Sequence, residues 1–427
     1  MGHRFSGAAV LRFLPFLSLS SLPPLPIRLG ARLCLTGLLA ALALVPACRA
    51  QKALHVPKAP PATLLVGCDG KTIHDPETAL TAVAPSGDRV LVFDVSAPAA
   101  PRLAGSVAVG NSVWGPPTNL ALAPAGAFAL VADSMRNVEQ EGAFVAVAKD
   151  EVHLIDLRAQ PIAWVGSVTV GLQPSGVDIS PHGALALTAN RKGQSVSRVA
   201  LGFVGERPTA RHLGDVDVAG QASDVRFTPD GKRALVTLFS EAAVAVLDVS
   251  GQDVTLAHRL DVVPNPYPVV VAPNGAFALV ASMGASSPSS DGVADPLGVI
   301  DLALTPPRMV AQVLVGDSPE GLAISPQGLH AATVNLTGSS SKATAPAYHR
   351  NATVSLLSLA RGPQTLEVLD TIEVGALAEG IAFSADGQYL FVGNFKDETL
   401  TVLRVQGRAL VTVGPPLALG CRPASLK

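Results

Sequence analysis

The 427-residue sequence predicts an all-β fold made of repeated four-stranded units, and three observations support this prediction. Gly and Pro are abundant, with 39 and 35 copies, whereas aromatic residues make up only 4% of the chain. A Gly-containing turn flanked by alternating apolar residues recurs along the sequence, and an apolar run follows each copy. Such an excess of chain-reversing residues over large core residues indicates many short strands joined by many turns.

The recurring turn has the form Pro-x-Gly, and roughly 50 residues separate one copy from the next. Apolar alternation on both sides of each turn predicts a β-hairpin, which supplies two strands per unit. The turns are Pro124–Gly126, Pro181–Gly183, Pro229–Gly231, Pro273–Gly275, Pro326–Gly328 and, with Ala in place of Pro, Ala385–Gly387.

A third and a fourth strand are expected in every unit. The fourth ends in Val-Gly, as at Val170-Gly171. Six units are complete in the sequence and the seventh is split, because Gly420–Lys427 matches the opening of a unit whose remainder is the segment from about Thr63 to Gly110. Seven such units, with the N- and C-terminal segments paired in one of them, predict a seven-bladed β-propeller with four antiparallel strands per blade. The third strands are expected to start at Val90, Val152, Val196, Val244, Leu297, Val354 and Leu400.

The amino-terminal region has the pattern of a targeting signal. Arg28 and Arg32 precede an uncharged apolar run from Leu33 to Ala47, which fits a secretory signal and is short for a membrane span. The run ends at Cys48 in a context that resembles the bacterial lipobox, so we expect lipidation of Cys48 or ordinary cleavage nearby. The expected location is the bacterial periplasm, or the membrane as an anchored lipoprotein. The predicted organisation is a targeting segment at 1–48, a linker at 49–62 and the propeller at 63–427.

Two cysteines, Cys68 and Cys421, remain in the folded part, one near each end. Closing the ring would bring them into one blade, so we predict a disulfide between them in an exported protein. A buried, reduced pair is the alternative.

Charge and motif content exclude several function classes. Lys+Arg 31 against Asp+Glu 33 gives a net charge of −2, which supplies no basic field for double-stranded nucleic acid. The nine His residues lack metal-ligand spacing, so the sequence predicts no metal site and no cofactor. We expect a monomer whose membrane contact comes only through the signal or lipid anchor.

Several second strands end in a similar four-residue motif whose last residue is Asn. The motif is Leu-Thr-Ala-Asn at 187–190, Ala-Thr-Val-Asn at 332–335 and Phe-Val-Gly-Asn at 391–394. From about Thr63 to Lys427 the chain resembles the YVTN-repeat, lactonase-like seven-bladed β-propellers. The resemblance implies the fold and, as the activity named for the family, lactone hydrolysis.

One face of the predicted ring carries three long loops between the second and third strands, at 134–151, 283–296 and 336–353. Long insertions at one position of a propeller often bind ligands or partners, although exposed loops also tolerate neutral insertion. Polar strand ends such as Asn190 can equally form local turns. The candidate ligand-binding residues are Trp114, Asn119, Asn190, Arg191, His349, Arg350 and Asn394.

Acidic residues near the starts of the innermost strands are the weak candidates for catalysis: Glu320, Glu379 and Asp224. A carboxylate cluster at the channel mouth could act as a general base, or could fix a water or a backbone amide. Asp178 and Arg226 occupy one equivalent position in adjacent units, where an ion pair near the axis is expected.

Two functions follow from these residues. The first is an exported scaffold, not an enzyme, that binds an unidentified small molecule or protein on its long-loop face. The alternative is a lactonase-like hydrolase that uses acidic residues near the central channel mouth.

Overall fold

The computed structural model describes residues 62–75, 77, 79–284, 290–360 and 362–427. These residues lie within one compact unit of the chain, His55–Lys427. The predicted targeting segment with Cys48, and nearly all of the predicted linker, lie outside the described residues. In the described part of the chain, no helix has the length and apolarity to cross a membrane. The helices there are short 3-10 turns, η1 (Phe239–Glu241) and η2 (Pro363–Thr365).

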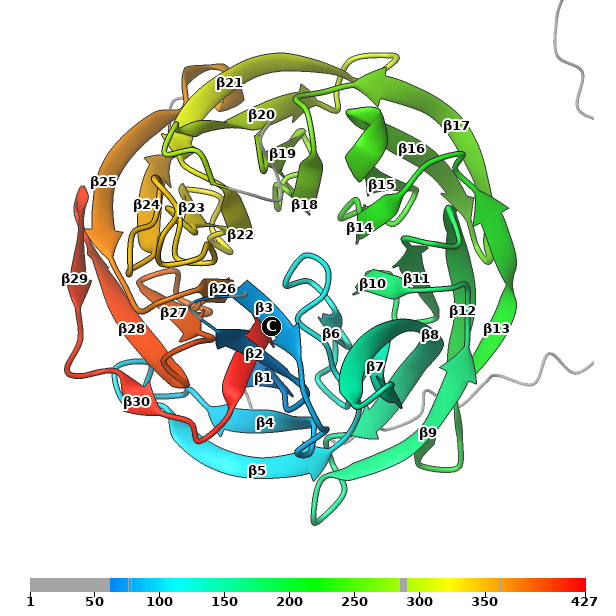
Figure 1. Ribbon diagram of the computed structural model, residues 1–427. Helices are drawn as coiled ribbons and strands as arrows, with labels where there is room; N and C mark the ends of the chain where they lie inside the picture. Colours follow the sequence, from blue (N-terminus) through cyan, green and yellow to red (C-terminus); the bar gives the residue numbers. More distant parts are fainter. Residues whose placement is uncertain (1–61, 76, 78, 285–289, 361) are drawn as a thin grey trace, which may run out of the picture. The chain divides into compact units, whose positions relative to one another are not determined.

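The described residues form seven antiparallel sheets around a common centre (Figure 1), six of four strands and one with a short fifth strand, which we number as blades 1 to 7. In each blade we name the strands from the innermost to the outermost. Blade 1 contains β31 (Arg422–Leu426), β1 (Thr63–Asp69), β4 (Arg89–Asp94) and β5 (Arg102–Ala108). Blade 2 contains β6 (Leu120–Leu122), β7 (Phe128–Gln140), β8 (Ala143–Asp156) and β9 (Ala163–Thr169). Blade 3 contains β10 (Pro174–Ile179), β11 (Leu185–Asn190), β12 (Ser195–Val204) and β13 (Arg207–Asp217).

Blades 4 to 7 repeat the same order. Blade 4 contains β14 (Ala222–Phe227), β15 (Arg233–Leu238), β16 (Ala243–Ser250) and β17 (Asp253–Asp261). Blade 5 contains β18 (Pro266–Val271), β19 (Phe277–Ser282), β20 (Asp295–Asp301) and β21 (Arg308–Gly316). Blade 6 contains β22 (Pro319–Ile324), β23 (His330–Asn335), β24 (Thr353–Ser358) and β25 (Glu367–Glu373). Blade 7 contains β26 (Ala378–Phe383), β27 (Tyr389–Asn394), β28 (Thr399–Gln406) and β29 (Ala409–Thr412), with the short β30 (Leu417–Ala418) also paired to β28.

The Pro-x-Gly turns join the first and second strands of blades 2 to 7, as the sequence predicts. The turn glycines have positive φ, for example 67° at Gly126 and 73° at Gly183. Each glycine donates its N–H to the carbonyl three residues earlier, as Gly183 does to Ser180 at 2.8 Å. The turn lies in a four-residue hairpin loop, as between Ser180 and Leu185, and its glycine takes the left-handed conformation, which explains why glycine stands at this position.

Small and branched apolar side chains fill the spaces between blades. Nine buried apolar clusters are found among the described residues, and seven of them each join one pair of neighbouring blades. The cluster between blades 7 and 1 contains Phe391, Leu400, Leu64 and Leu426. Apolar packing is therefore continuous around the ring, including the junction between its two ends.

The C-terminal strand closes the ring. β31 pairs antiparallel with β1, with Leu426 opposite Val66 and Ser425 opposite Gly67, so the inner edge of β1 is covered. Cys68 and Cys421 form a disulfide with a Cα–Cα distance of 5.8 Å. The ring is thus closed by strand pairing, apolar packing and a covalent bond.

One expected loop is instead regular structure. Residues 134–151 mostly continue β7 and β8 as a two-stranded extension of blade 2. Glu141 and Gly142 form its turn with φ of 51° and 81°, as a two-residue hairpin loop with both central residues left-handed requires. A second hairpin, β2 (Thr72–Asp75) with β3 (Ala79–Ala82), follows β1 and lies over the centre of the ring in Figure 1.

Candidate functional site

Two sets of equivalent positions converge near the ring axis on the face that carries hairpin β2–β3. The first set, which we call the floor, is the second residue of the innermost strand in blades 3 to 7 and the equivalent residue in blades 1 and 2. Its side chains are buried. The floor residues are Thr118, Ser175, Ser223, Tyr267, Glu320, Glu379 and Ala424.

The second set, which we call the wall, is the residue that directly follows the second strand. Each wall N–H donates to a carbonyl just before the innermost strand of its blade: Arg191 to Gln173 at 2.9 Å, and Met283 to Asn265 at 3.1 Å. This repeated bond fixes where the chain leaves the second strand. In blades 3 to 7 the wall residues are Arg191, Phe239, Met283, Leu336 and Phe395.

Contacts between non-adjacent blades show that these side chains point towards the axis. Arg191 of blade 3 donates a hydrogen bond to the hydroxyl of Tyr267 in blade 5, at 3.4 Å. Its guanidinium also lies over the rings of Phe239 and Tyr267, at 5.5 and 5.6 Å from their centroids. Trp114 joins the same region, because the adjacent Gly115 packs against the Ser175 hydroxyl. We call Trp114, Ser175, Arg191, Tyr267, Glu320 and Glu379 the axial site.

The structure brings Glu320 and Glu379 together in neighbouring blades, and both are buried. Burial raises the pKa of Glu320, although the positive charge of Arg191 and a hydrogen bond with Glu379 oppose this rise. Burial also raises the pKa of Glu379, and the negative charge of Glu320 raises it further. Because the pKa of Glu320 is raised to about 8 and that of Glu379 is raised as well, the pair shares a single proton only at mildly alkaline pH. Glu320 is then the ionised member, because Arg191 stabilises its charged form.

Several polar atoms of the axial site are buried and have no hydrogen-bond partner among the described residues. These atoms are Glu379 Oε2, Arg191 Nε, Ser175 Oγ and Trp114 Nε1. Buried polar groups are nearly always satisfied by protein, water or ligand. Three donors and one acceptor around a carboxyl pair would suit a small ligand that carries several oxygen atoms.

The other predicted acidic residue is placed differently. Asp224 lies one position further along its strand than Glu320 and Glu379. It accepts hydrogen bonds from Val225 N at 2.8 Å and from Val269 N at 2.9 Å. It therefore links blades 4 and 5.

Asn119 also lies one position beyond the floor residue of its blade. Its amide donates to the carbonyl oxygens of Ser112 and Ala132, at 3.4 and 3.3 Å. These bonds hold the segment before β6 in place, and Asn119 belongs to the internal framework of blade 2.

The predicted residues Asn190 and Asn394 end their strands as fully buried groups. Each amide nitrogen bridges to two hydroxyls of the third strand, at 3.0 and 2.9 Å from Asn190 and at 2.9 and 2.8 Å from Asn394. We call this arrangement the hydroxyl clamp, since it ties the second strand to the third.

His349 and Arg350 lie in the long 336–353 segment and are exposed. His349 Nε2 is 3.6 Å from Glu373 Oε1, and Arg350 Nη2 is 2.9 Å from Asp397 Oδ1. Their contacts do not include an axial-site residue in the described part of the chain.

Asp178 and Arg226 form the expected link near the axis, with 3.8 Å between Oδ1 and Nη1. Asp178 also accepts the N–H of Phe227 at 2.9 Å. Both residues line a cavity of about 460 Å³ that Lys427 also borders, towards the turn ends of the innermost strands.

Sequence reasoning missed Ser175, Tyr267 and Phe239. Tyr267 follows Pro266 as Glu320 follows Pro319, so aligning the innermost strands on this proline would have identified it. Phe239 lies one residue beyond the second strand, at a position whose residue type changes from blade to blade and carries no repeated signal.

Among the described residues, one group of metal-ligating side chains lies within mutual reach: Asp133, Glu151 and His153 in blade 2. These residues belong to one blade and are not part of the axial site.

Comparison with known proteins gives fold relationships. No family model and no curated protein sequence matches the chain. A Bacteroides uniformis structure described as a candidate 6-phosphogluconolactonase superposes with a TM-score of 0.66 at 14% identity, over 86% of this chain and 98% of that one. Pseudomonas aeruginosa periplasmic gluconolactonase, PpgL, gives a TM-score of 0.60 at 15% identity with the same coverage. Kuenenia stuttgartiensis hydrazine synthase gives 0.53 at 20% identity, over 69% of this chain and 78% of that one. The chain therefore has the fold of the lactonase-like β-propellers.

Proposed function

We propose that the protein is an exported lactonase-like hydrolase that opens a polyhydroxylated sugar lactone in the axial site. The observation that carries this proposal is the convergence of Glu320 and Glu379 beside Arg191. When the surroundings of two paired carboxyls push their pKa values apart, one carboxyl can act as a base while the other acts as an acid at the same pH.

The chemistry needs one proton acceptor and one proton donor. Ionised Glu320 takes a proton from water as the water oxygen attacks the lactone carbonyl carbon. Arg191 and the Ser175 hydroxyl stabilise the negative charge that develops on the carbonyl oxygen. The ring carbon–oxygen bond then breaks, and protonated Glu379 gives its proton to the departing oxygen. Water and lactone become one hydroxy acid, and a proton transfer between the two carboxyls resets the pair.

The unpaired polar atoms support a sugar-like substrate. Glu379 Oε2 offers an acceptor, and Arg191 Nε and Trp114 Nε1 offer donors. Trp114 and Tyr267 add aromatic surface of the kind that packs against the C–H faces of sugar rings. The names of the structural neighbours, which include a gluconolactonase, agree with this substrate class.

Binding without turnover is the second candidate function. It is favoured by the depth of the carboxyl pair, since Glu320 is 7% and Glu379 2% exposed. In this case the ligand would satisfy the unpaired atoms without being hydrolysed. The Cys68–Cys421 disulfide supports export under either function.

Ring opening is measured by alkali consumption at constant pH, with gluconolactone and its 6-phosphate as probes. The spontaneous rate is subtracted. Glu320→Gln and Glu379→Gln should each lower kcat/KM roughly 10²–10⁴-fold, the usual contribution of a positioned acid or base. Glu139→Gln, which changes an exposed carboxylate on the blade 2 extension, is the matched control and should retain full activity. Equal rates for all four proteins would reject the hydrolase, and ligand binding without ring opening would support the second function.

A further inference from the structure

Blade 2 departs from the hydroxyl clamp that blades 3, 6 and 7 use. In blades 3, 6 and 7, an Asn at the end of the second strand bridges two hydroxyls on the third strand at 2.8–3.2 Å. All of these groups are uncharged. The clamps are Asn190 with Ser195 and Ser197, Asn335 with Thr353 and Ser355, and Asn394 with Thr399 and Thr401.

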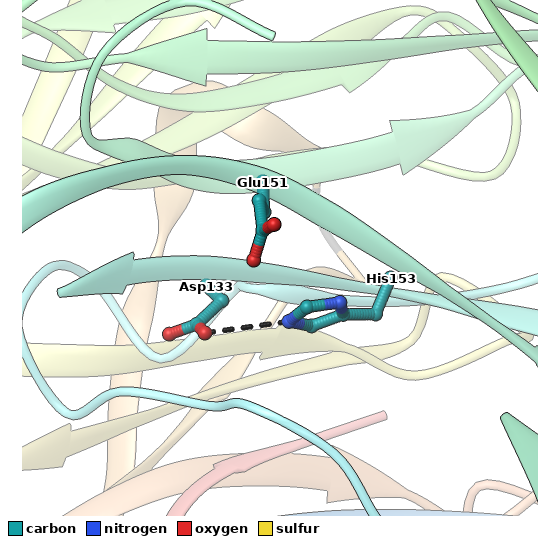
Figure 2. Close-up of side chains that lie close together, drawn as sticks. All are labelled: Asp133, Glu151 and His153. Carbon is teal, nitrogen blue, oxygen red and sulfur yellow. Dashed lines mark hydrogen bonds and ion pairs between the residues drawn. The ribbon is translucent and has the colours of Figure 1, made fainter. Parts of the chain in front are cut away.

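The equivalent positions of blade 2 hold a carboxylate, a second carboxylate and an imidazole. Strand pairing places Asp133 opposite Glu151, as it places Asn190 opposite Ser195. His153 follows two residues later on the same face of β8. Figure 2 shows the three side chains directed towards one another, and one ligand atom from each lies within 4.8 Å of the other two.

The group contains more negative than positive charge. Lys149 Nζ lies 2.6 Å from Asp133 Oδ2 and 2.7 Å from Glu151 Oε2. Lys71 Nζ lies 2.5 Å from Asp88 Oδ2 and 4.0 Å from Asp133 Oδ1. Three carboxylates thus face two ammonium groups, and Asp133 Oδ1 is buried without a hydrogen-bond partner among the described residues. A further positive charge would balance the cluster.

The imidazole is held as metal-binding histidines usually are. His153 Nδ1 is hydrogen-bonded to Ser167 Oγ at 2.7 Å, which leaves Nε2 facing Asp133 Oδ2 at 3.3 Å. Two ligands of a tetrahedral zinc ion, each about 2.0–2.1 Å from the metal, lie about 3.3 Å apart. A hydrogen bond to the second ring nitrogen is the typical support of such a ligand. Gly110 packs against this pair, and a Cβ there would overlap both Asp133 Oδ2 and His153 Nε2.

We propose that Asp133, Glu151 and His153 bind a divalent first-row transition metal, with zinc as the best match to one nitrogen and two oxygen ligands. Water completes the tetrahedron, as it does in three-ligand zinc sites. The metal replaces the ammonium group of Lys149, whose side chain is 21% exposed and can turn towards solvent. The site is independent of the proposed hydrolase, because it uses none of the axial residues.

Cobalt(II) titration of the full chain tests the proposal, because tetrahedral cobalt has visible absorption bands. Lys149→Met removes the competing charge and should tighten cobalt binding by about tenfold or more. Ser167→Ala removes the support of His153 and should weaken binding roughly 10–100-fold. The triple variant Asp133→Asn, Glu151→Ser, His153→Ser restores the uncharged clamp and should show no bands from this site. The thiols of Cys34 and Cys48 can also bind cobalt and are present in every variant. The Asp133 site is therefore judged from the differences in cobalt spectra between variants.

Zinc-dependent thermal unfolding is the second readout. Zinc should raise the Tm of the unmodified protein and leave that of the folded triple variant unchanged. Identical cobalt spectra for the unmodified and triple-variant proteins would overturn the proposal. Cobalt binding by Lys149→Met but not by the unmodified protein would also overturn the proposal, since the Lys149 ammonium would then permanently occupy the place of the metal between Asp133 and Glu151.

Discussion

Replacing Glu379 by Gln should stabilise the protein at alkaline pH relative to the unmodified chain. Glu320 and Glu379 are buried together, and burial raises the pKa of each above the ordinary value of 4.5. The folded chain therefore keeps protons that the unfolded chain has released. Stability from these groups is fully present below pH 4.5 and is lost as the pH rises through the raised pKa values.

The magnitude follows from the charge left in the site. Arg191 can compensate one carboxylate, but ionising both leaves a second buried charge without a partner of opposite sign. A buried charge without a partner costs about 3–5 kcal/mol. Gln at position 379 has nearly the same shape and cannot ionise, so the variant should lose about 3 kcal/mol less stability between pH 5 and pH 9.

Urea unfolding at pH 5, 7 and 9 measures this difference. Glu139→Gln serves as the exposed control and should follow the unmodified protein at every pH. Parallel stability curves for Glu379→Gln and the unmodified protein would refute the reasoning, because they would mean that the two carboxyls do not share a proton.

Three further predictions concern the framework. Gly380→Ala should destabilise the fold by about 1–3 kcal/mol in urea unfolding, because the Cβ of the new alanine would overlap the backbone nitrogen of Leu426. Gly202→Ala is the control and should change stability little, because a Cβ there has only one neighbour, at 3.7 Å. Equal destabilisation by the two variants would contradict this prediction. Asn394→Ala should lower stability by about 1–3 kcal/mol, seen as a lower Tm, because the hydroxyl clamp loses the hydrogen bonds from Asn394 to Thr399 and Thr401. An unchanged Tm would mean that the clamp does not stabilise the blade. Reduction of the Cys68–Cys421 disulfide should lower stability by about 2–4 kcal/mol, and peptide mapping of unreduced protein that finds Cys68 and Cys421 as free thiols would contradict the bond.

The fold was predictable because its signals are local and repeated. Each Pro-x-Gly turn needs a left-handed glycine, as Gly126 shows, and the repeat makes one ambiguous turn unimportant. Ring closure followed from the incomplete unit at the C-terminus. The extension at 134–151 was misread as a loop, because its turn Glu141-Gly142 lacks the proline that marks the others.

The site was predictable only in part. Glu320 and Glu379 occupy one position of consecutive units, so the repeat alone indicated that they meet. Tyr267 and Phe239 differ in type from their counterparts in other blades, and their convergence with Arg191 depends on distances across the axis. The Asp133 group escaped detection because strand register brings Glu151 and His153 to it, without the short spacing by which metal motifs are recognised.

The most direct test of the proposed hydrolase is a crystal structure of the protein soaked with gluconate, the hydroxy acid that ring opening would release. Electron density is expected in the axial site, with the ligand carboxylate near Arg191 and Ser175 and its hydroxyls within hydrogen-bond distance of Glu379. Gluconate bound only in the cavity beside Asp178 and Arg226, or absent from the axial site at saturating concentration, would contradict the account.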